Sequence, residues 1–105
     1  MEWVAVCPAA DLPPGAHRNV EIDGTHVVVF NLEGELHAIE DVCTHDGGRL
    51  TGGCVEGDQI VCPRHGARFS IRTGQALTAP AYEPTAVFPV RVRDGVIETR
   101  DDRWD

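Results

Sequence analysis

Residues 43–69 read CTHDGGRLTGGCVEGDQIVCPRHGARF and contain two short motifs, Cys43-Thr44-His45 and Cys62-Pro63-Arg64-His65. Each motif offers one thiolate and one imidazole, and together they form a ligand set for a transition metal or an iron–sulfur centre. No other group of residues in the sequence competes with these four as a chemical site. The two motifs therefore predict a metal centre and leave the identity of the metal open.

Turn-forming dipeptides punctuate the chain outside the motifs. Each consists of an acidic residue and a glycine between short runs of β-branched and apolar residues, which is the signature of a β-hairpin. The dipeptides are Asp23-Gly24, Glu33-Gly34, Glu56-Gly57 and Asp94-Gly95. The pattern predicts strands over residues 3–6, 18–22, 25–31, 35–39, 58–61, 86–93 and 96–99. No window sustains a helical period beyond a short turn near residues 9–12, so the fold class is all-β.

The predicted strands explain how the four candidate ligands converge. Residues 39–42 lead into Cys43, and residues 60–61 lead into Cys62. Residues 46–53 contain two glycine pairs and are expected to form an irregular loop. Strands that end side by side would bring the two loops together at one end of a sheet, and rigid strands supply the convergence that a metal site needs.

Length and charge limit the class of protein. The 105 residues predict a single domain, residues 1–105, and the formal net charge is −8. No basic run neutralises phosphates, so nucleic acid is not expected as a partner. No run approaches the ~20 apolar residues of a membrane span, and no basic leader opens the chain, so the expected location is the cytoplasm. Thiols there stay reduced, which favours metal binding over disulfides.

The order of the ligands separates two kinds of metal site. A Cys2His2 zinc site has the same ligand types, but it usually groups Cys with Cys and His with His. Here each motif is mixed, which suits a centre of the Rieske kind, where two Cys bind one iron and two His bind the other. A zinc-stabilised interaction module remains an alternative. Cys7 and Cys54 fall outside the motifs and are expected to be a buried residue and a loop thiol without a role.

The chain resembles a Rieske-type [2Fe–2S] ferredoxin of the bacterial kind that supplies electrons to oxygenases. The matching residues are Cys43-Thr44-His45, Leu50, Cys62-Pro63-Arg64-His65-Gly66, Phe69, Thr73-Gly74 and Pro80. The resemblance implies an antiparallel β-sandwich or barrel with a cluster-binding subdomain of two loops, at about residues 41–84. It also implies one [2Fe–2S] cluster per chain, with Cys43 and Cys62 on the inner iron, His45 and His65 on the outer iron, and Pro80 in a loop over the cluster.

The function that the resemblance implies is that of a soluble, monomeric one-electron carrier. Its partners would be a flavin-dependent ferredoxin reductase and a terminal oxygenase such as an aromatic-ring dioxygenase. The alternative within redox chemistry is a redox subunit or partner of another system, such as a nitrite reductase or iron–sulfur assembly. The chain shows no nucleophile–base pair and no open coordination position, so it is expected to be an electron-transfer component rather than an enzyme.

Departures from respiratory Rieske proteins predict a low reduction potential. Gly48 and Arg64 stand where those proteins carry two disulfide-bonded cysteines, and Ala67 and Phe69 stand where they carry a Ser and a Tyr hydroxyl. Hydrogen bonds to the sulfurs stabilise the reduced state, so their loss lowers the potential toward the lower part of the Rieske range of about −150 to +300 mV.

Charged and aromatic residues near the motifs carry further expectations. Three arginines are expected near the cluster tip, namely Arg49, Arg64 and Arg68, and the acidic residues within 33–41 are expected beside the tip. A partner protein would therefore meet either an Arg rim or an acidic flank. Asp46 either tunes His45 or forms the turn. Three further histidines, His17, His26 and His37, are expected to be surface or packed imidazoles. The candidate contact residues are Trp3, Trp104 and residues 80–84.

Overall fold

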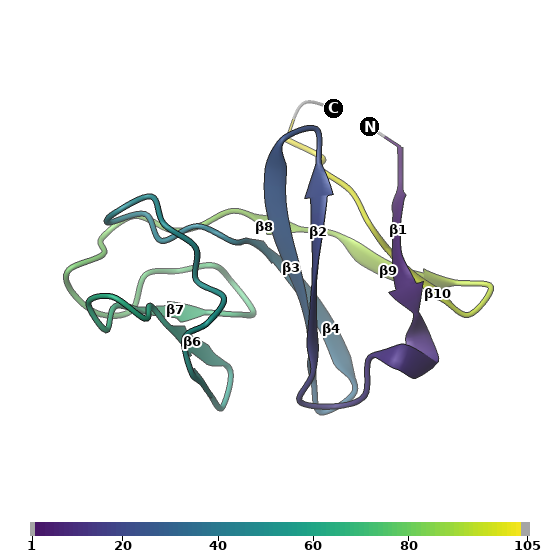
Figure 1. Cartoon of the computed structure of the whole chain (residues 1–105), viewed down its shortest axis with the longest axis horizontal. Helices are drawn as coiled ribbons and strands as arrows, with labels where there is room; N and C mark the ends of the chain where they lie inside the picture. The colour runs from purple at the N-terminus through teal and green to yellow at the C-terminus, as the bar shows by residue number, and fades with distance from the viewer. Residues whose placement is uncertain (1, 104–105) are drawn as a thin grey trace.

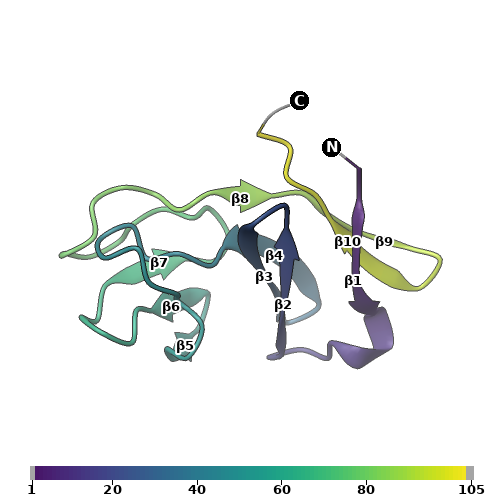
Figure 2. The same cartoon turned by 45° about the horizontal axis from the view of Figure 1, so that its top comes forward.

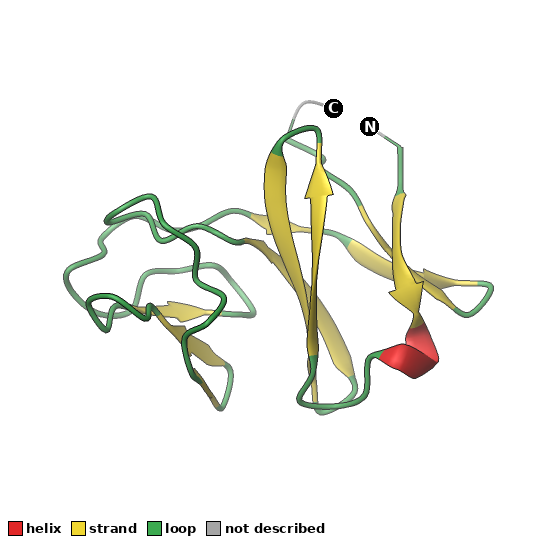
Figure 3. Cartoon of the chain, in the orientation of Figure 1, coloured by secondary structure: helices red, strands yellow, loops and turns green. Residues whose placement is uncertain are grey.

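A computed structural model of the protein describes residues 2–103. Over that range the chain consists of short strands and loops with a single turn of 3-10 helix (Figure 3). The elements are β1 Val4–Pro8, η1 Ala9–Asp11, β2 His17–Ile22, β3 Thr25–Leu32, β4 Glu35–Glu40, β5 Val55–Glu56, β6 Gln59–Val61, β7 Arg68–Ser70, β8 Val87–Phe88, β9 Val90–Arg93 and β10 Val96–Thr99. The all-β prediction is confirmed. None of the helical structure in residues 2–103 has the length and apolar character to cross a membrane.

The strands form three antiparallel sheets, with the orders β1-β10-β9, β2-β3-β4-β8 and β5-β6-β7. The four-stranded sheet stands in the middle of the molecule (Figure 1). The β1-β10-β9 sheet lies on one side of it, and β5-β6-β7 with the long loops lies on the other, in both views (Figures 1 and 2). The loops that carry the two motifs thus gather at the end of the molecule away from β1.

Strand β3 is the wall between two hydrophobic clusters. Successive side chains of a strand point to opposite faces. Val28 and Phe30 pack with the residues of the loop region, including Cys43, whereas Val27 and Val29 pack with the residues of β1, β8 and β10. Because both faces of β3 are covered, the middle sheet gives the ligand loops a rigid support.

Three of the four predicted hairpin turns have the expected geometry, whereas Glu56 belongs to β5 and the turn from β5 to β6 consists of Gly57 and Asp58. Asp23 and Gly24 join β2 to β3 with φ angles of 48° and 85°, and Asp94 and Gly95 join β9 to β10 with 52° and 78°. Positive φ at both central residues defines the tight turn whose twist matches paired strands. The β2–β3 ladder accordingly pairs without interruption down to Ile22 opposite Thr25.

The strand prediction was wrong at three places. The expected strand over 86–93 is interrupted at Pro89, so β8 pairs with β4 while β9 pairs with β10. Proline has no N–H to donate to a ladder, which lets the chain leave one sheet and enter another there. Strands β5 and β7 were not predicted, because two or three residues are too few to show an alternating pattern.

Candidate metal centre

The two motif cysteines lie inside the protein and close together. Cys43 follows β4 and is fully buried, and Cys62 follows β6 and is 1 % exposed. Their Sγ atoms and a carboxylate oxygen of Asp46 all lie within 4.8 Å of one another. The fold therefore brings together the two thiols that the sequence singled out.

Both ligand loops are built on the same backbone turn. In each, the cysteine N–H donates to a carbonyl five residues ahead, and the cysteine carbonyl accepts from the N–H four residues ahead. The bonds are Cys43 N to Gly48 O at 2.7 Å, Gly47 N to Cys43 O at 2.7 Å, Cys62 N to Ala67 O at 2.7 Å and Gly66 N to Cys62 O at 3.0 Å. Gly47 and Gly66 have φ angles of 74° and 75°, which glycine adopts without strain. Each turn places its histidine between the cysteine and the positive-φ glycine.

The two motif histidines meet at the surface. The rings of His45 and His65 are exposed, and their centroids are 5.3 Å apart with an edge-to-face angle of 86°. Both sulfurs are thus internal and both imidazoles external. The fold thus brings the two sulfurs together and the two imidazole rings together, with each histidine in the same turn as its cysteine.

The two motif sulfurs need a compensating cation if both are to be ionised. Burial raises the pKa of the Cys43 thiol, and the neighbouring Cys62 raises it further, while backbone N–H groups of the loop oppose the shift. Thiols must lose their protons to bind a metal, and a buried thiolate pair needs compensating positive charge. Two buried sulfurs beside two exposed ring nitrogens fit a centre of two irons, one held by each kind of ligand.

Asp41 is a residue whose role the sequence did not reveal. Its carboxylate is only 3 % exposed and accepts four hydrogen bonds. The donors are Leu50 N at 2.8 Å, Thr51 N at 2.9 Å, Thr51 Oγ1 at 2.7 Å and Asn19 Nδ2 at 2.9 Å. Asp41 thus ties the end of the first ligand loop to its start and to β2. The sequence placed it on an exposed acidic flank, because spacing alone does not show which backbone N–H groups will face a carboxylate.

The segment around Pro80 lies against the first ligand loop. The Ala79–Pro80 peptide bond is cis. The Thr44 hydroxyl donates to the Glu83 carbonyl at 2.7 Å, and residues of the two segments line a shallow hollow at the surface beside His45. Tyr82 in this segment is 83 % exposed. The structure therefore places Pro80 beside a candidate ligand, and a position of its loop over the cluster stays a prediction.

The arginines expected at the tip are not an unpaired basic rim. Arg64 pairs with Asp46, and Arg68 pairs with Glu56 at 2.9 Å. The Arg49 guanidinium contacts the ring of His26. The expectation of an Arg rim is corrected accordingly, because acidic neighbours offset two of the three charges.

The expected acidic flank is also partnered. Glu35 pairs with Arg72, and Glu40 pairs with Arg103 at 3.1 Å. Asp41 is buried, as described above. Net charge alone therefore gives a poor picture of this end of the molecule, because most of these carboxylates have a specific partner.

Asp46 acts on its own loop. Its carboxylate accepts the N–H of Gly48 at 2.9 Å, as a turn-forming residue does. The Arg64 guanidinium holds the pKa of the Asp46 carboxyl well below its usual range. Of the two expectations for Asp46, the structure shows the turn and adds an ion pair with the second ligand loop.

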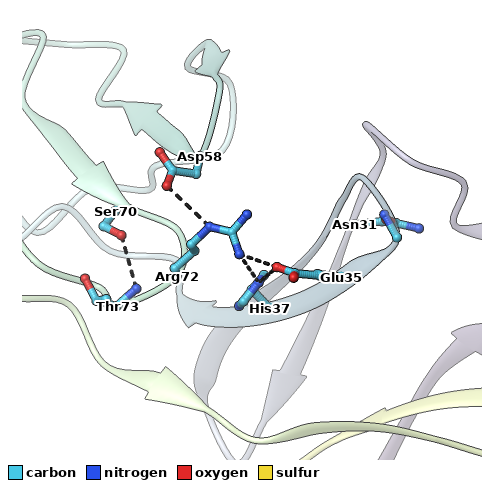
Figure 4. Close-up of polar contacts among 8 residues, drawn as sticks. Asn31, Glu35, His37, Asp58, Ser70, Arg72 and Thr73 are labelled. Carbon is cyan, nitrogen blue, oxygen red and sulfur yellow. Dashed lines mark hydrogen bonds and ion pairs between the residues drawn. The ribbon is translucent and has the colours of Figure 1, made fainter.

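Arg72 joins the small sheet to the middle sheet (Figure 4). Its Nη1 contacts the Glu35 carboxylate at the start of β4, and its Nε lies 3.3 Å from Asp58 Oδ2 in the β5–β6 turn. Glu35 also contacts the ring of His37 at 3.3 Å, and Arg72 lowers the pKa of Glu35. Ion pairs thus link the base of the ligand-loop region to the β3–β4 hairpin.

The remaining residues singled out in the sequence lie elsewhere. Cys7 is buried and Cys54 is exposed, and both are free, as predicted. His17 packs against Phe30 with ring centroids 5.6 Å apart. Trp3 directly precedes β1, and the Arg91 guanidinium lies over its ring, 4.1 Å from the ring centroid. Trp104 lies outside the described residues.

Comparison with known proteins identifies the class to which this fold and site belong. The Rieske [2Fe–2S] domain family matches residues 2–89, so the chain belongs to the Rieske [2Fe–2S] family, and the family implies a [2Fe–2S] cluster.

The relatives specify the kind of Rieske protein. The chain is 40% identical over 99 residues to the 3-phenylpropionate/cinnamic acid dioxygenase ferredoxin subunit of Shigella flexneri, covering 92% of each protein. It is 36% identical over 96 residues to ferredoxin CarAc of Metapseudomonas resinovorans, covering 90% of each. A solved chain in the complex of reduced oxygenase and oxidized ferredoxin in carbazole 1,9a-dioxygenase matches with a TM-score of 0.87 and 37% identity, covering 92% of this chain and 91% of that one. The chain is thus a Rieske-type ferredoxin, an electron-transfer protein.

Proposed function

We propose that this chain carries single electrons from a flavin-dependent ferredoxin reductase to a terminal oxygenase, with an aromatic-ring dioxygenase as the acceptor. The observation that carries the proposal is the pair of exposed imidazoles, His45 and His65, set over a buried pair of sulfurs. The Shigella flexneri relative is a dioxygenase ferredoxin subunit, and the solved chain comes from a complex in carbazole 1,9a-dioxygenase, which favours that acceptor over a nitrite reductase or an iron–sulfur assembly system. A cytoplasmic location and a monomeric state belong to the same proposal.

The four motif residues hold one cluster per chain in this proposal. Cys43 and Cys62 bind the inner iron, and His45 and His65 bind the outer iron, within a single domain whose residues 41–84 form the cluster-binding part. The cluster supplies one-electron chemistry, and the protein holds the cluster where electrons can pass between it and a partner protein. Because both imidazoles are exposed, they bring the metal centre close to the surface at which a partner protein docks.

The surface beside the imidazoles suits a protein partner. Tyr82 projects from the Pro80 segment, and a large exposed aromatic side chain is the kind of residue that anchors protein–protein contacts. Thr44 and Glu83 are joined by a hydrogen bond, which holds this segment in place next to His45. In the proposal, the partner covers His45, His65 and Tyr82 together.

The proposal includes a low reduction potential. Ala67 and Phe69 are both fully buried and carry no hydroxyl group that could donate to a sulfur. The expected midpoint lies in the lower part of the Rieske range of about −150 to +300 mV. A redox titration that places the midpoint well above zero would contradict this expectation.

Substitution of single ligands tests the assignment. Cys43→Ser and His65→Asn should each abolish the visible absorption and the EPR signal of the reduced cluster. Cys54→Ser and His17→Asn are matched controls and should retain both, because these residues lie outside the site. Full iron and sulfide content in Cys43→Ser would contradict the assignment.

Reconstitution tests the electron-transfer function. The purified protein should be reduced by a flavin reductase with NADH and should then be reoxidised by the oxygenase component of an aromatic-ring dioxygenase. Product formation should depend on this chain and stop in Cys43→Ser. Reduction without any reoxidation by oxygenases encoded near this chain would refute the oxygenase as acceptor. Light scattering on the purified protein tests the monomer, and cell fractionation tests the location.

A further inference from the structure

The side chain of Arg64 links the two ligand loops. From the second loop, its Nε donates to Asp46 Oδ2 at 2.5 Å, and its Nη2 donates to Asp46 Oδ1 at 3.0 Å. The same Nη2 donates to the backbone carbonyl of Arg49 at 2.9 Å. Both acceptors belong to the first loop, so one guanidinium spans the two segments that carry the candidate ligands.

The guanidinium also reaches a ligand sulfur. Arg64 Nη2 lies 3.4 Å from Cys62 Sγ, within the reach of an N–H···S hydrogen bond. Cys62 is almost fully buried, whereas the Arg64 side chain is 38 % exposed. A positive donor therefore approaches the sulfur from the outer side. Asp46 fixes its direction, because a guanidinium that binds both oxygens of a carboxylate has little freedom to turn.

Gly48 provides the space that this arrangement needs. A Cβ atom at position 48 would lie 2.6 Å from Arg64 Cζ and 2.7 Å from Nη2. The φ angle of Gly48 lies outside the left-handed region, so an alanine at this position would not strain the backbone. Its Cβ atom would instead clash with the side chain of Arg64. Gly48 and Arg64 are thus complementary in shape.

We propose that Arg64, oriented by Asp46 and seated on Gly48, is a positioning residue that raises the reduction potential of the cluster by donating a hydrogen bond to Cys62 Sγ. The proposal rests on the assignment of Cys62 as a ligand. Reduction adds negative charge to the cluster, and a donor to a ligand sulfur stabilises the more negative state. Arg64 thereby offsets part of the loss of the two hydroxyl groups at positions 67 and 69.

An ion pair between Arg64 and Asp46 without a bond to the sulfur would shift the potential little, because its two opposite charges largely offset each other and solvent screens them. Exposed salt bridges contribute little to stability, so unfolding measurements on Arg64 variants do not distinguish the two roles. The midpoint potential does distinguish them, because it responds only to interactions that differ between the oxidised and reduced cluster.

The experiment measures the midpoint potentials of four loaded proteins. Arg64→Gln removes the donor, and Gly48→Ala displaces the guanidinium while keeping every charge. Arg68→Gln is the control, because it removes a neighbouring arginine that pairs with Glu56. With a net hydrogen-bond contribution of the usual size, the reduction equilibrium constant should fall about two- to tenfold in Arg64→Gln and Gly48→Ala. A tenfold fall equals 59 mV for a one-electron couple. The control should stay at the wild-type value.

Resonance Raman spectroscopy supplies a second readout if one variant binds the cluster poorly. The Fe–S stretching frequencies of the wild-type protein should shift between H2O and D2O in resonance Raman spectra, and this shift should shrink in Gly48→Ala. Wild-type midpoints in both variants, or an equal fall in Arg68→Gln, would overturn the proposal. Failure of the wild-type protein to give a rhombic signal on reduction would instead overturn the proposed function, so the two failures are distinguishable.

Discussion

Replacement of Asp41 by alanine should release the first ligand loop. The substitution leaves four donors without their charged acceptor, among them the two backbone N–H groups of Leu50 and Thr51. Hydrogen bonds to charged groups contribute about 1.5–3 kcal/mol each, but they share one carboxylate and are not additive, so we expect a loss of about 3–5 kcal/mol. For a domain of this size that loss lowers Tm by about 12 °C or more.

The assay follows the bleaching of the cluster and the backbone circular dichroism during heating. Asp41→Asn keeps an oxygen acceptor and should lose less than the alanine variant. Asp102→Ala is the control, since it removes an exposed carboxylate of the same charge. A Tm within about 4 °C of wild type in Asp41→Ala, with full iron content, corresponds to about 1 kcal/mol or less and would show that Asp41 does not hold the first ligand loop in place.

Three further predictions concern charge, docking and pH. Arg72 lowers the pKa of Glu35, so the ionised Glu35 stabilises the fold at neutral pH. The Tm difference between Glu35→Gln and wild type should therefore shrink as pH falls below about 4.3, the pKa of Glu in the unfolded chain. A Tm difference that stays constant with pH would contradict this prediction. Tyr82→Ala should lower the rate constant of electron transfer to the oxygenase about tenfold, as loss of an interface anchor does. Val92→Ala, which changes an exposed residue of β9, is the control and should leave the rate constant unchanged. Equal rate constants in the two variants would exclude Tyr82 from the interface. An iron-bound imidazole that faces water loses its proton more readily when the cluster is oxidised, so the midpoint potential should fall as pH rises in the alkaline range. A midpoint potential that does not change with pH in this range would argue against histidine ligands that face water.

Local signals in the sequence predict most of the fold. The acidic residue and glycine of each hairpin turn are neighbours in sequence, so the turn at Asp23 and Gly24 could be predicted from the dipeptide alone. Pro89 is also a local signal, since it marks the interruption between β8 and β9, but the apolar residues around it favoured one continuous strand in the sequence. Strand β7 was not predictable, because its three residues gain their structure from pairing with β6 and from packing of Phe69 in the core.

The site divides in the same way between local and distant information. The mixed order of Cys43, His45, Cys62 and His65 is readable from the chain, and the fold brings these residues together. The supporting contacts are not readable, because they join residues far apart in sequence. Arg64 meets Asp46 across 18 positions, and the space above Gly48 exists only when both loops are in place.

The EPR spectrum of the reduced protein, taken with iron and sulfide analysis, shows directly whether the chain holds a [2Fe–2S] cluster. We expect a rhombic signal that integrates to one spin per chain, together with two irons and two acid-labile sulfides per chain. A colourless protein that contains a single zinc ion and gives no signal on reduction would contradict it.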